Sequence, residues 1–192
     1  MSHKHTLLLK QADSISHLYI NMISVKFSEI NINKQRKYNE AINKMNICQI
    51  ECTCGHCGCL VRHGYYKRKV KTKDETITLY ILRVKCKECR KTHAILPDMI
   101  IPYSQIPADI QHKIIKGDKA EYINEITNPD IVESDIYRIR MNYRKHWKER
   151  IKSIFLTIED KIEVIIEGCY KYFGKLFMQI KRCLIKKFFV ST

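Results

Sequence analysis

Residues 51–59 have the sequence ECTCGHCGC, and residues 85–89 have the sequence KCKEC. Cys54 and Cys57 form one CxxC pair, Cys86 and Cys89 form a second, and 28 residues lie between the two pairs. Two such turns close four thiolates around a tetrahedral zinc ion. Disulfides are the other explanation, but nothing marks the chain as secreted, and in a reducing compartment paired CxxC turns are more often metal sites. The spacing therefore predicts a zinc ribbon.

The first turn offers more ligands than zinc needs. Cys54 with Cys57 has the best local geometry, because Gly55 permits a tight turn and Gly58 lets backbone amides approach the sulfurs. Cys54 with Cys59 stays open as an alternative. Cys52 is a further candidate ligand, and His56 lies among these crowded residues. We expect Cys48 to be an ordinary apolar residue, and His63 and His93 to support the site or lie at the surface.

Composition points to a polyanionic partner. The chain has 192 residues, enough for two small domains, and its net charge is +15, from 35 Lys and Arg against 20 Asp and Glu. Nucleic acid is the commonest partner of such a surface. The first ten residues lack a secretory pattern, and no apolar run is long enough to span a bilayer. We expect a soluble, cytoplasmic, nucleoid-associated protein without a membrane or small-molecule partner.

Between the two cysteine turns, the pattern predicts a basic β-hairpin. Residues 60–70 and 76–85 show strand signals on either side of a polar turn. From Arg62 to Lys91 there are eleven Lys or Arg and three acidic residues, with Tyr65 and Tyr66 interleaved. Such a surface suits phosphate contacts and base stacking. The candidate phosphate contacts on this hairpin are Arg62, Lys67, Arg68 and Lys69.

The rest of the chain divides by composition and periodicity. Residues 1–47 form an N-terminal extension, with a short strand at 22–27 and a helical pattern at 34–45. The ribbon spans 48–96, and a segment with three prolines, 97–108, is expected to be a linker. Three helices, at 109–116, 119–126 and about 134–152, predict a helix-turn-helix over 109–154. A helical basic tail, 155–192, follows; its residues 175–190 suit a cationic amphipathic helix.

The third helix has an apolar face and a basic face. Ile139, Tyr143 and Trp147 gather on the side expected to pack, whereas basic residues cover the opposite side. A recognition helix places its N-terminal residues on base edges and other residues on phosphates. The candidate DNA contacts on this helix are Arg138, Asn142, Arg144, Lys145 and Lys148.

Two stretches carry a resemblance to a known family: CGHCGCLVRHGYYKR at 54–68 and ILRVKCKECRKTHAILPDMIIPYSQI at 81–106. They resemble zinc-ribbon, transposase-like proteins of low-GC Gram-positive bacteria, a domain of unknown function. The layout is similar to the N-terminal zinc-binding region of insertion-sequence transposases, and the likeness covers about residues 48–150. In look-alikes serine can replace Cys57 while cysteines remain at the positions of Cys54 and Cys59, which supports the second pairing. The last ten residues do not share the resemblance and suit a decayed element copy.

These observations predict an α+β protein, with a small zinc ribbon followed by an all-helical helix-turn-helix region. The acidic residues after Ile126 lie on expected helices without strands between them, so a three-carboxylate transposase sheet has no room. We therefore expect no enzyme, but a zinc-dependent protein that binds double-stranded DNA and derives from or acts with a mobile element. Further expected partners are a transposase subunit or a second copy of the chain. Two other hypotheses are a protein-interaction module and a binder of single-stranded nucleic acid or RNA.

Overall fold

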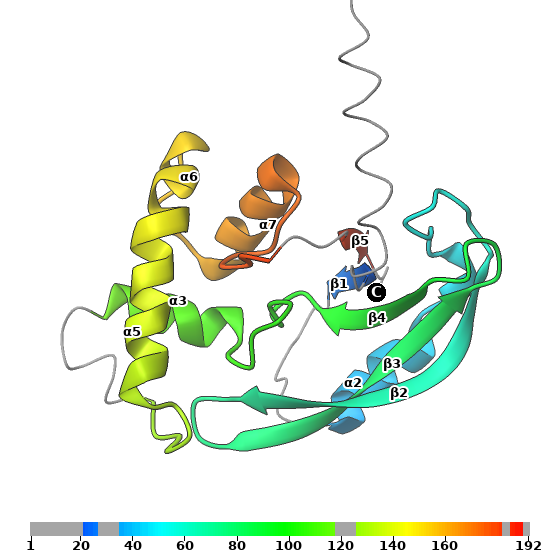
Figure 1. Cartoon of the computed structure of the whole chain (residues 1–192), viewed down its shortest axis with the longest axis horizontal. Coiled ribbons are helices and arrows are strands. Elements are labelled where there is room, and N and C mark those ends of the chain that lie inside the picture. Colours follow the sequence, from blue (N-terminus) through cyan, green and yellow to red (C-terminus); the bar gives the residue numbers. More distant parts are fainter. Residues whose placement is uncertain (1–20, 27–34, 118–125, 182–184, 190–192) are drawn as a thin grey trace, which may run out of the picture.

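One five-stranded mixed sheet forms the centre of the computed structural model, which describes residues 21–26, 35–117, 126–181 and 185–189 (Figure 1). The strands are β1 (Asn21–Lys26), β2 (Leu60–Lys71), β3 (Thr76–Cys86), β4 (Thr92–Pro97) and β5 (Ile185–Phe189). Their order across the sheet is β2-β3-β4-β1-β5. β2, β3 and β4 pair antiparallel, whereas β1 pairs parallel with both β4 and β5.

This sheet contradicts the expected fold class, a small ribbon followed by an all-helical helix-turn-helix region. β1 comes from the expected N-terminal extension and β5 from the expected tail, yet both complete the same sheet as the hairpin. Residues 185–189 form a strand where we expected a cationic helix. Parallel pairing joins segments that lie far apart in the sequence, so the local patterns of β1 and β5 did not reveal their partners.

The hairpin of β2 and β3 has two different faces. Its register places Lys67 opposite Tyr80 and Lys69 opposite Thr78 on one face, with exposed side chains on both strands. The register shifts between Arg62 and Gly64, and Gly64 has a φ of +116°, which a side chain would strain. On the other face of β3, Leu79 and Ile81 are buried in a first hydrophobic core, which also contains residues of β1, β4 and α2.

Helix α2 (Gln35–Lys44) closes the part of the β3 edge that β4 leaves open (Figure 1). β4 pairs with β3 only from Arg83 to Lys85. Beyond that point the Leu82 N–H donates to the Tyr38 hydroxyl at 2.8 Å, and this hydroxyl donates to the Ile95 carbonyl at 3.0 Å. The side-chain amide of Gln35 binds both the N–H and the carbonyl of Tyr80. Side chains of α2 thus satisfy backbone groups that a neighbouring strand would otherwise pair.

The helices after β4 pack around a second hydrophobic core. They are α3 (Ala108–Lys116), α5 (Glu133–Asn142), α6 (Lys148–Ser153) and α7 (Ile162–Phe173). The Trp147 ring is fully buried in this core, with its centroid 6.3 Å from Phe173 and 6.4 Å from Phe177. The expected second helix, 119–126, falls almost wholly outside the described residues.

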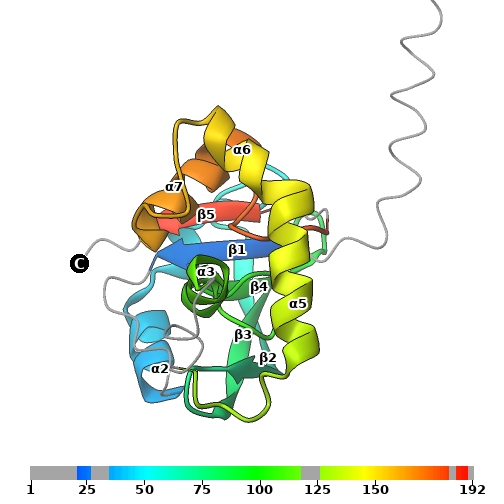
Figure 2. The same cartoon turned by 90° about the vertical axis from the view of Figure 1, so that its left-hand side faces the viewer.

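A π-helical segment, η3 (Tyr143–Trp147), joins α5 to α6 into one long helix (Figure 2). Ile139, Tyr143, Trp147 and Ile151 recur every four residues and all pack into the second core. In a regular α-helix, a side chain four residues further along points about 40° away from the previous one around the helix axis. The underwound turn, with the Lys148 N–H bonded to the Tyr143 carbonyl, keeps this row on one face.

The hairpin tip lies beside the start of α5 in both views (Figures 1 and 2), and side-chain and backbone contacts join the two. The ammonium of Lys71 lies 2.7 Å from an Asp135 carboxylate oxygen, and both side chains are largely buried. Asn128 donates its backbone N–H to the Lys73 carbonyl and its side-chain amide to the Thr72 carbonyl. These contacts attach the hairpin tip to the start of the long helix.

The segment at 97–108, expected to be a linker, packs against the hairpin. Ile100, Ile101 and Ile106 are buried. The Arg68 guanidinium donates to the carbonyls of Ile101 and Ser104, at 2.9 and 2.8 Å. Among the helices that the structure describes, none has the length and apolar character needed to cross a membrane.

Candidate metal centre

Two turns meet at the end of the hairpin that lies away from α5 (Figure 1). The first follows the 3₁₀ turn η2 (Ile47–Gln49), and in it the Cys52 N–H donates to the His56 carbonyl at 2.8 Å. Gly55 and Gly58 have φ values of +91° and +72°, so this tight loop requires residues without side chains at both positions. The second turn joins β3 to β4, and the Lys87 N–H donates to the Cys59 carbonyl at 2.8 Å, which holds the two turns together.

Four cysteine sulfurs converge where these turns meet. The Sγ atoms of Cys52, Cys54, Cys86 and Cys89 all lie within 4.8 Å of one another. The Sγ atoms of Cys52 and Cys89 are 3.7 Å apart, and those of Cys54 and Cys86 are 3.8 Å apart. In a tetrahedral zinc site with Zn–S bonds of about 2.3 Å, neighbouring sulfurs lie about 3.8 Å apart. The four thiols can therefore hold a metal ion with little rearrangement.

Three of the four ligands expected from the sequence belong to this group. Cys54, Cys86 and Cys89 are brought together, whereas Cys57 is exposed and lies outside the group. Cys52, which the sequence offered only as a further alternative, takes part and is fully buried. Cys59 is buried beside the site and its thiol donates to the His56 carbonyl at 3.2 Å.

Two of the four thiols ionise more easily than usual. Hydrogen bonding from the His56 backbone, helped by the His56 ring at 3.4 Å, lowers the pKa of Cys54 to about 6. Burial acts to raise the pKa of Cys86, but hydrogen bonds from the Cys89 backbone and neighbouring thiols outweigh it, so the pKa is lowered. Thiolate is the form that binds metal, so these two sulfurs are prepared as ligands.

The other two thiols of the group, those of Cys52 and Cys89, and the neighbouring thiol of Cys59 lose a proton less easily than usual. Burial is the largest cause that raises the pKa values of Cys52 and Cys89, and it raises that of Cys59 to about 11. A metal ion that binds all four sulfurs would displace the protons of Cys52 and Cys89, so its affinity would increase with pH.

One histidine supports the group from inside the sheet. His93, on β4, is fully buried, and its Nε2 atom lies 3.2 Å from the Cys52 sulfur. Burial lowers the pKa of His93, which favours the neutral ring. His63 is exposed on β2 and His56 is exposed beside Cys54. An N–H from His93 to a thiolate of Cys52 would orient that ligand.

The basic residues predicted on the hairpin do not all face solvent. Arg62, Lys67 and Lys69 are exposed, but Arg68 is half-buried and bound to the two carbonyls of the 97–108 segment. Sequence alternation could have placed Arg68 on the inner face, since it lies one residue from Lys67 and Lys69.

The basic residues predicted on the long helix are mostly exposed. Arg144, Lys145 and Lys148 face solvent, and Asn142 is half-buried. Arg138 is exposed too, but its guanidinium pairs with the Asp135 carboxylate at 2.5 Å. The structure thus presents basic side chains on both β2 and the long helix.

Comparison with known proteins adds one finding. Residues 52–139 match a family described as "Domain of unknown function (DUF6431)". That match begins at Cys52, includes both cysteine turns and the whole hairpin, and ends within α5. No curated protein and no solved structure matched the chain. The chain is therefore similar to this family over the metal centre, the hairpin and the first part of the long helix.

Proposed function

We propose that this chain is a zinc-binding protein that binds double-stranded DNA and performs no catalytic step. The metal would be Zn²⁺, because four thiolates at these separations suit a tetrahedral ion and soft sulfur ligands favour it. Its role would be structural, since all four positions around the ion would be taken by protein ligands. The resemblance to insertion-sequence transposases is the ground for proposing the ends of a mobile element as the target.

The observation that carries the DNA-binding proposal is the set of contacts that attach the long helix to the hairpin tip. Arg144, Lys145 and Lys148 on the helix, and Lys67 and Lys69 on β2, are exposed. Because the hairpin tip is fixed to the start of α5, these groups keep a constant separation. Cations held on a rigid frame can contact successive phosphates without an ordering cost at each contact.

Fluorescence anisotropy with random duplex DNA over a salt series tests this proposal. The zinc-loaded protein should bind less tightly as salt increases, because binding releases counterions from the phosphates. Changing Arg144, Lys145 and Lys148 together to Ala should lower affinity and reduce the salt slope by about 2 to 3. The control changes Lys161, which immediately precedes α7, and Lys171 on α7, both exposed, to Ala. Absent or salt-insensitive binding, or an equal effect of the control, would contradict the proposal.

A protein-interaction module is the second candidate, and exposed apolar side chains on α5 favour it. Tyr137 is 67% exposed and Met141 is 38% exposed, one turn apart on the same helix. Tyrosine and methionine are enriched in protein interfaces. If the partner is a protein, Tyr137→Ala and Met141→Ala should weaken binding of that partner. The variant with Arg144, Lys145 and Lys148 changed to Ala should bind the partner as the parent protein does.

A further inference from the structure

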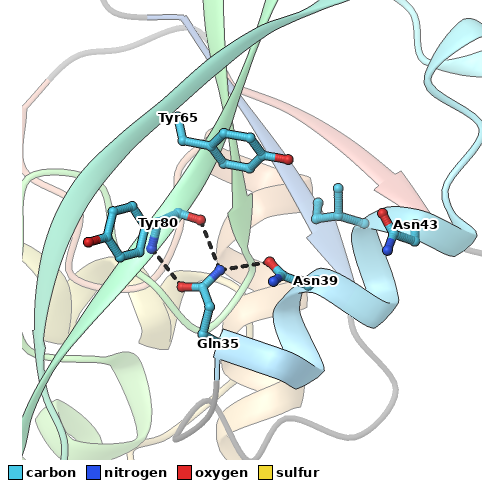
Figure 3. Close-up of a pocket in the computed structure, with 6 residues that line it drawn as sticks. Gln35, Asn39, Asn43, Tyr65 and Tyr80 are labelled. Atoms are coloured by element: carbon cyan, nitrogen blue, oxygen red, sulfur yellow. Dashed lines mark hydrogen bonds between the residues drawn. The ribbon is translucent and has the colours of Figure 1, made fainter.

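A groove lies between α2 and the exposed face of the hairpin, and its lining includes none of the four clustered cysteines (Figure 3). Its volume is about 380 Å³, near the lower end of the range for small-ligand sites. The lining combines two aromatic rings, three side-chain amides and one aliphatic side chain: Gln35, Asn39, Ile42, Asn43, Tyr65 and Tyr80.

Two tyrosines line this groove, and Figure 3 shows the Tyr65 ring on the side of the α2 amides and the Tyr80 ring pointing away from them. Tyr65 is 52% exposed and Tyr80 is 46% exposed, although large aromatic side chains are usually buried more fully. The hairpin register places Tyr65 opposite Leu82 and Lys67 opposite Tyr80, so the two rings are diagonal neighbours on one face. Figure 3 shows the Tyr65 ring extending over the amide side chains of α2. An exposed ring face of this kind can stack on a planar ligand.

The neighbouring tyrosine, Tyr66, does not share this face. It is half-buried, packs against the first core, and its hydroxyl lies 3.5 Å from the Arg68 guanidinium. Of the two tyrosines that the sequence suggested for stacking, Tyr65 and Tyr66, only Tyr65 lines the groove.

Amides on α2 line the opposite wall at spacings of one helical turn. Gln35 binds the backbone of Tyr80 and also donates to the Asn39 Oδ1 atom at 2.7 Å. This bond fixes the Asn39 side chain with its Nδ2 donor left over. Within the described residues, neither that Nδ2 atom nor the side chain of Asn43 forms a hydrogen bond. These two amides offer donors and an acceptor beside the Tyr65 ring, the groups that bind the edges of nucleobases.

Cations flank the groove on the hairpin side. The Lys67 ammonium lies 5.8 Å from the centre of the Tyr80 ring. The Arg62 guanidinium lies 3.4 Å from the Ile42 carbonyl, near the end of α2. Both side chains are exposed, so they can contact an anion that follows the groove.

We propose that this groove binds an unpaired nucleobase, from a single-stranded end or an extruded nucleotide of the bound DNA. The base stacks on Tyr65, the amides of Asn39 and Asn43 bind its edge, and Arg62 and Lys67 contact the phosphates on either side. The inference rests on the proposed nucleic-acid binding and extends it, since it assigns an unpaired segment to a site distinct from the basic helix.

Three probes test the groove: a blunt duplex, the same duplex with an overhang of about six unpaired nucleotides, and the overhang strand alone. The overhang carries 2-aminopurine, whose fluorescence is quenched when it stacks. The overhang duplex should bind about tenfold more tightly than the blunt duplex, since stacking on one aromatic ring can contribute this much. The 2-aminopurine signal should fall on binding.

Variants of the groove should remove the overhang preference and keep the blunt-duplex affinity. Tyr65→Leu keeps apolar cover over α2 but removes the aromatic face, and the pair Asn39→Ala and Asn43→Ala removes the edge contacts. Tyr172→Leu, at a tyrosine 62% exposed on α7, is the matched control. Thermal melting of each variant separates a loss of binding from a loss of folding.

The outcomes for the two proposals are distinct. If the blunt duplex binds but the overhang preference and the quenching survive Tyr65→Leu in a folded protein, the groove proposal is overturned and the duplex proposal stands. If the blunt duplex does not bind, but the single strand quenches 2-aminopurine in the parent protein and not in Tyr65→Leu, the groove proposal stands alone. Equal effects of Tyr172→Leu and Tyr65→Leu would overturn it.

Discussion

Cys52 is the residue at which the structure adds most to the sequence. The CxxC pattern favoured Cys54 with Cys57, but the buried sulfur that completes the group belongs to Cys52, two residues before Cys54. A CxC spacing brings two sulfurs together here because the loop turns sharply, with the Gly55 N–H bonded to the Cys52 carbonyl. The pattern of spacings alone does not contain that turn.

Removing single thiols distinguishes the ligand sets. Cys52→Ser should lose most of the bound zinc, whereas Cys57→Ser should retain about one zinc ion per chain. The measurement is metal content of the purified proteins, with a colorimetric titration of zinc release. Cys169→Ser is the control, because Cys169 is fully buried in the second core, where burial raises its pKa to about 12. Retention of zinc by Cys52→Ser together with loss in Cys57→Ser would restore the assignment based on CxxC spacing.

His112 should make stability depend on pH. Its Nε2–H donates to the Ile158 carbonyl at 2.7 Å, and burial lowers its pKa. The unfolded chain then binds more protons than the folded one below a pH of about 6.5. The stability due to neutral His112 is therefore fully present above that pH and decreases as the pH falls through the lowered value.

Urea unfolding at pH values of about 7.5 and 5.5 measures this effect. The parent protein should lose stability at the lower pH, and His112→Gln should lose less. Because other groups, including His93 and the metal ligands, also titrate, only the difference between the two proteins reports on His112. An identical pH dependence in both would show that His112 is not the cause.

Among the elements, the hairpin and the long helix are joined by one ion pair. Lys71 and Asp135 come from β2 and α5, with side chains only 18% and 8% exposed. Removing Asp135 leaves the largely buried Lys71 ammonium with the Asp130 carbonyl but without a carboxylate, whereas removing Lys71 leaves Asp135 paired only with the exposed guanidinium of Arg138. The pair therefore contributes to the fixed geometry on which the DNA-binding proposal depends.

Asp135→Asn should reduce the free energy of unfolding by about 2 to 3 kcal/mol. Lys71→Met should reduce it as well, and the double variant should lose less than the sum, because both members of the pair are then gone. Urea denaturation of the four proteins measures the coupling. Glu149→Gln is the control, since its pair with Lys152 is exposed and should contribute less than about 0.5 kcal/mol. Additive losses at Lys71 and Asp135 would mean that the pair is uncoupled.

Individual elements were more predictable than their assembly. The alternation in residues 76–85 predicted β3 almost to its end, and the spacing of Ile139, Tyr143 and Trp147 predicted the buried face of the long helix. Periodicity of two or of about 3.6 residues is a local signal. The π turn at 143–147 was not predicted, because apolar residues at a spacing of four also occur on regular α-helices.

At the scale of the whole molecule, the candidate metal centre belongs to the sheet rather than to a separate ribbon. Cys52, Cys59 and Cys86 are members of the first hydrophobic core, together with residues of β1, β4 and α2. A change at the cysteine site should therefore extend into the sheet. The sequence could not show that the cysteines share a core with the sheet, because β1 precedes the hairpin in the sequence and β4 follows it.

Chelation should test this coupling. Removing the metal should lower the melting temperature of the sheet and leave much of the helical signal from the second core, because that core contains none of the four clustered cysteines. Circular dichroism during heating, with and without a strong chelator, provides the measurement, and re-addition of zinc should restore the melting curve. An unchanged melting curve after exhaustive chelation would mean that the cysteine group is not a metal site.

The position of β1 determines when the sheet can be completed during synthesis. Met22 pairs with Ala94 on one side and with Ile185 on the other, so β1, the first strand in the described part of the chain, needs β5, the last one described, as a neighbour. At roughly 5 to 20 residues per second, the hairpin emerges on the order of 5 to 20 seconds before β5. During that interval one edge of β1 is open to pairing with other chains. Expression yield should therefore respond to the rate of translation between residues 86 and 185.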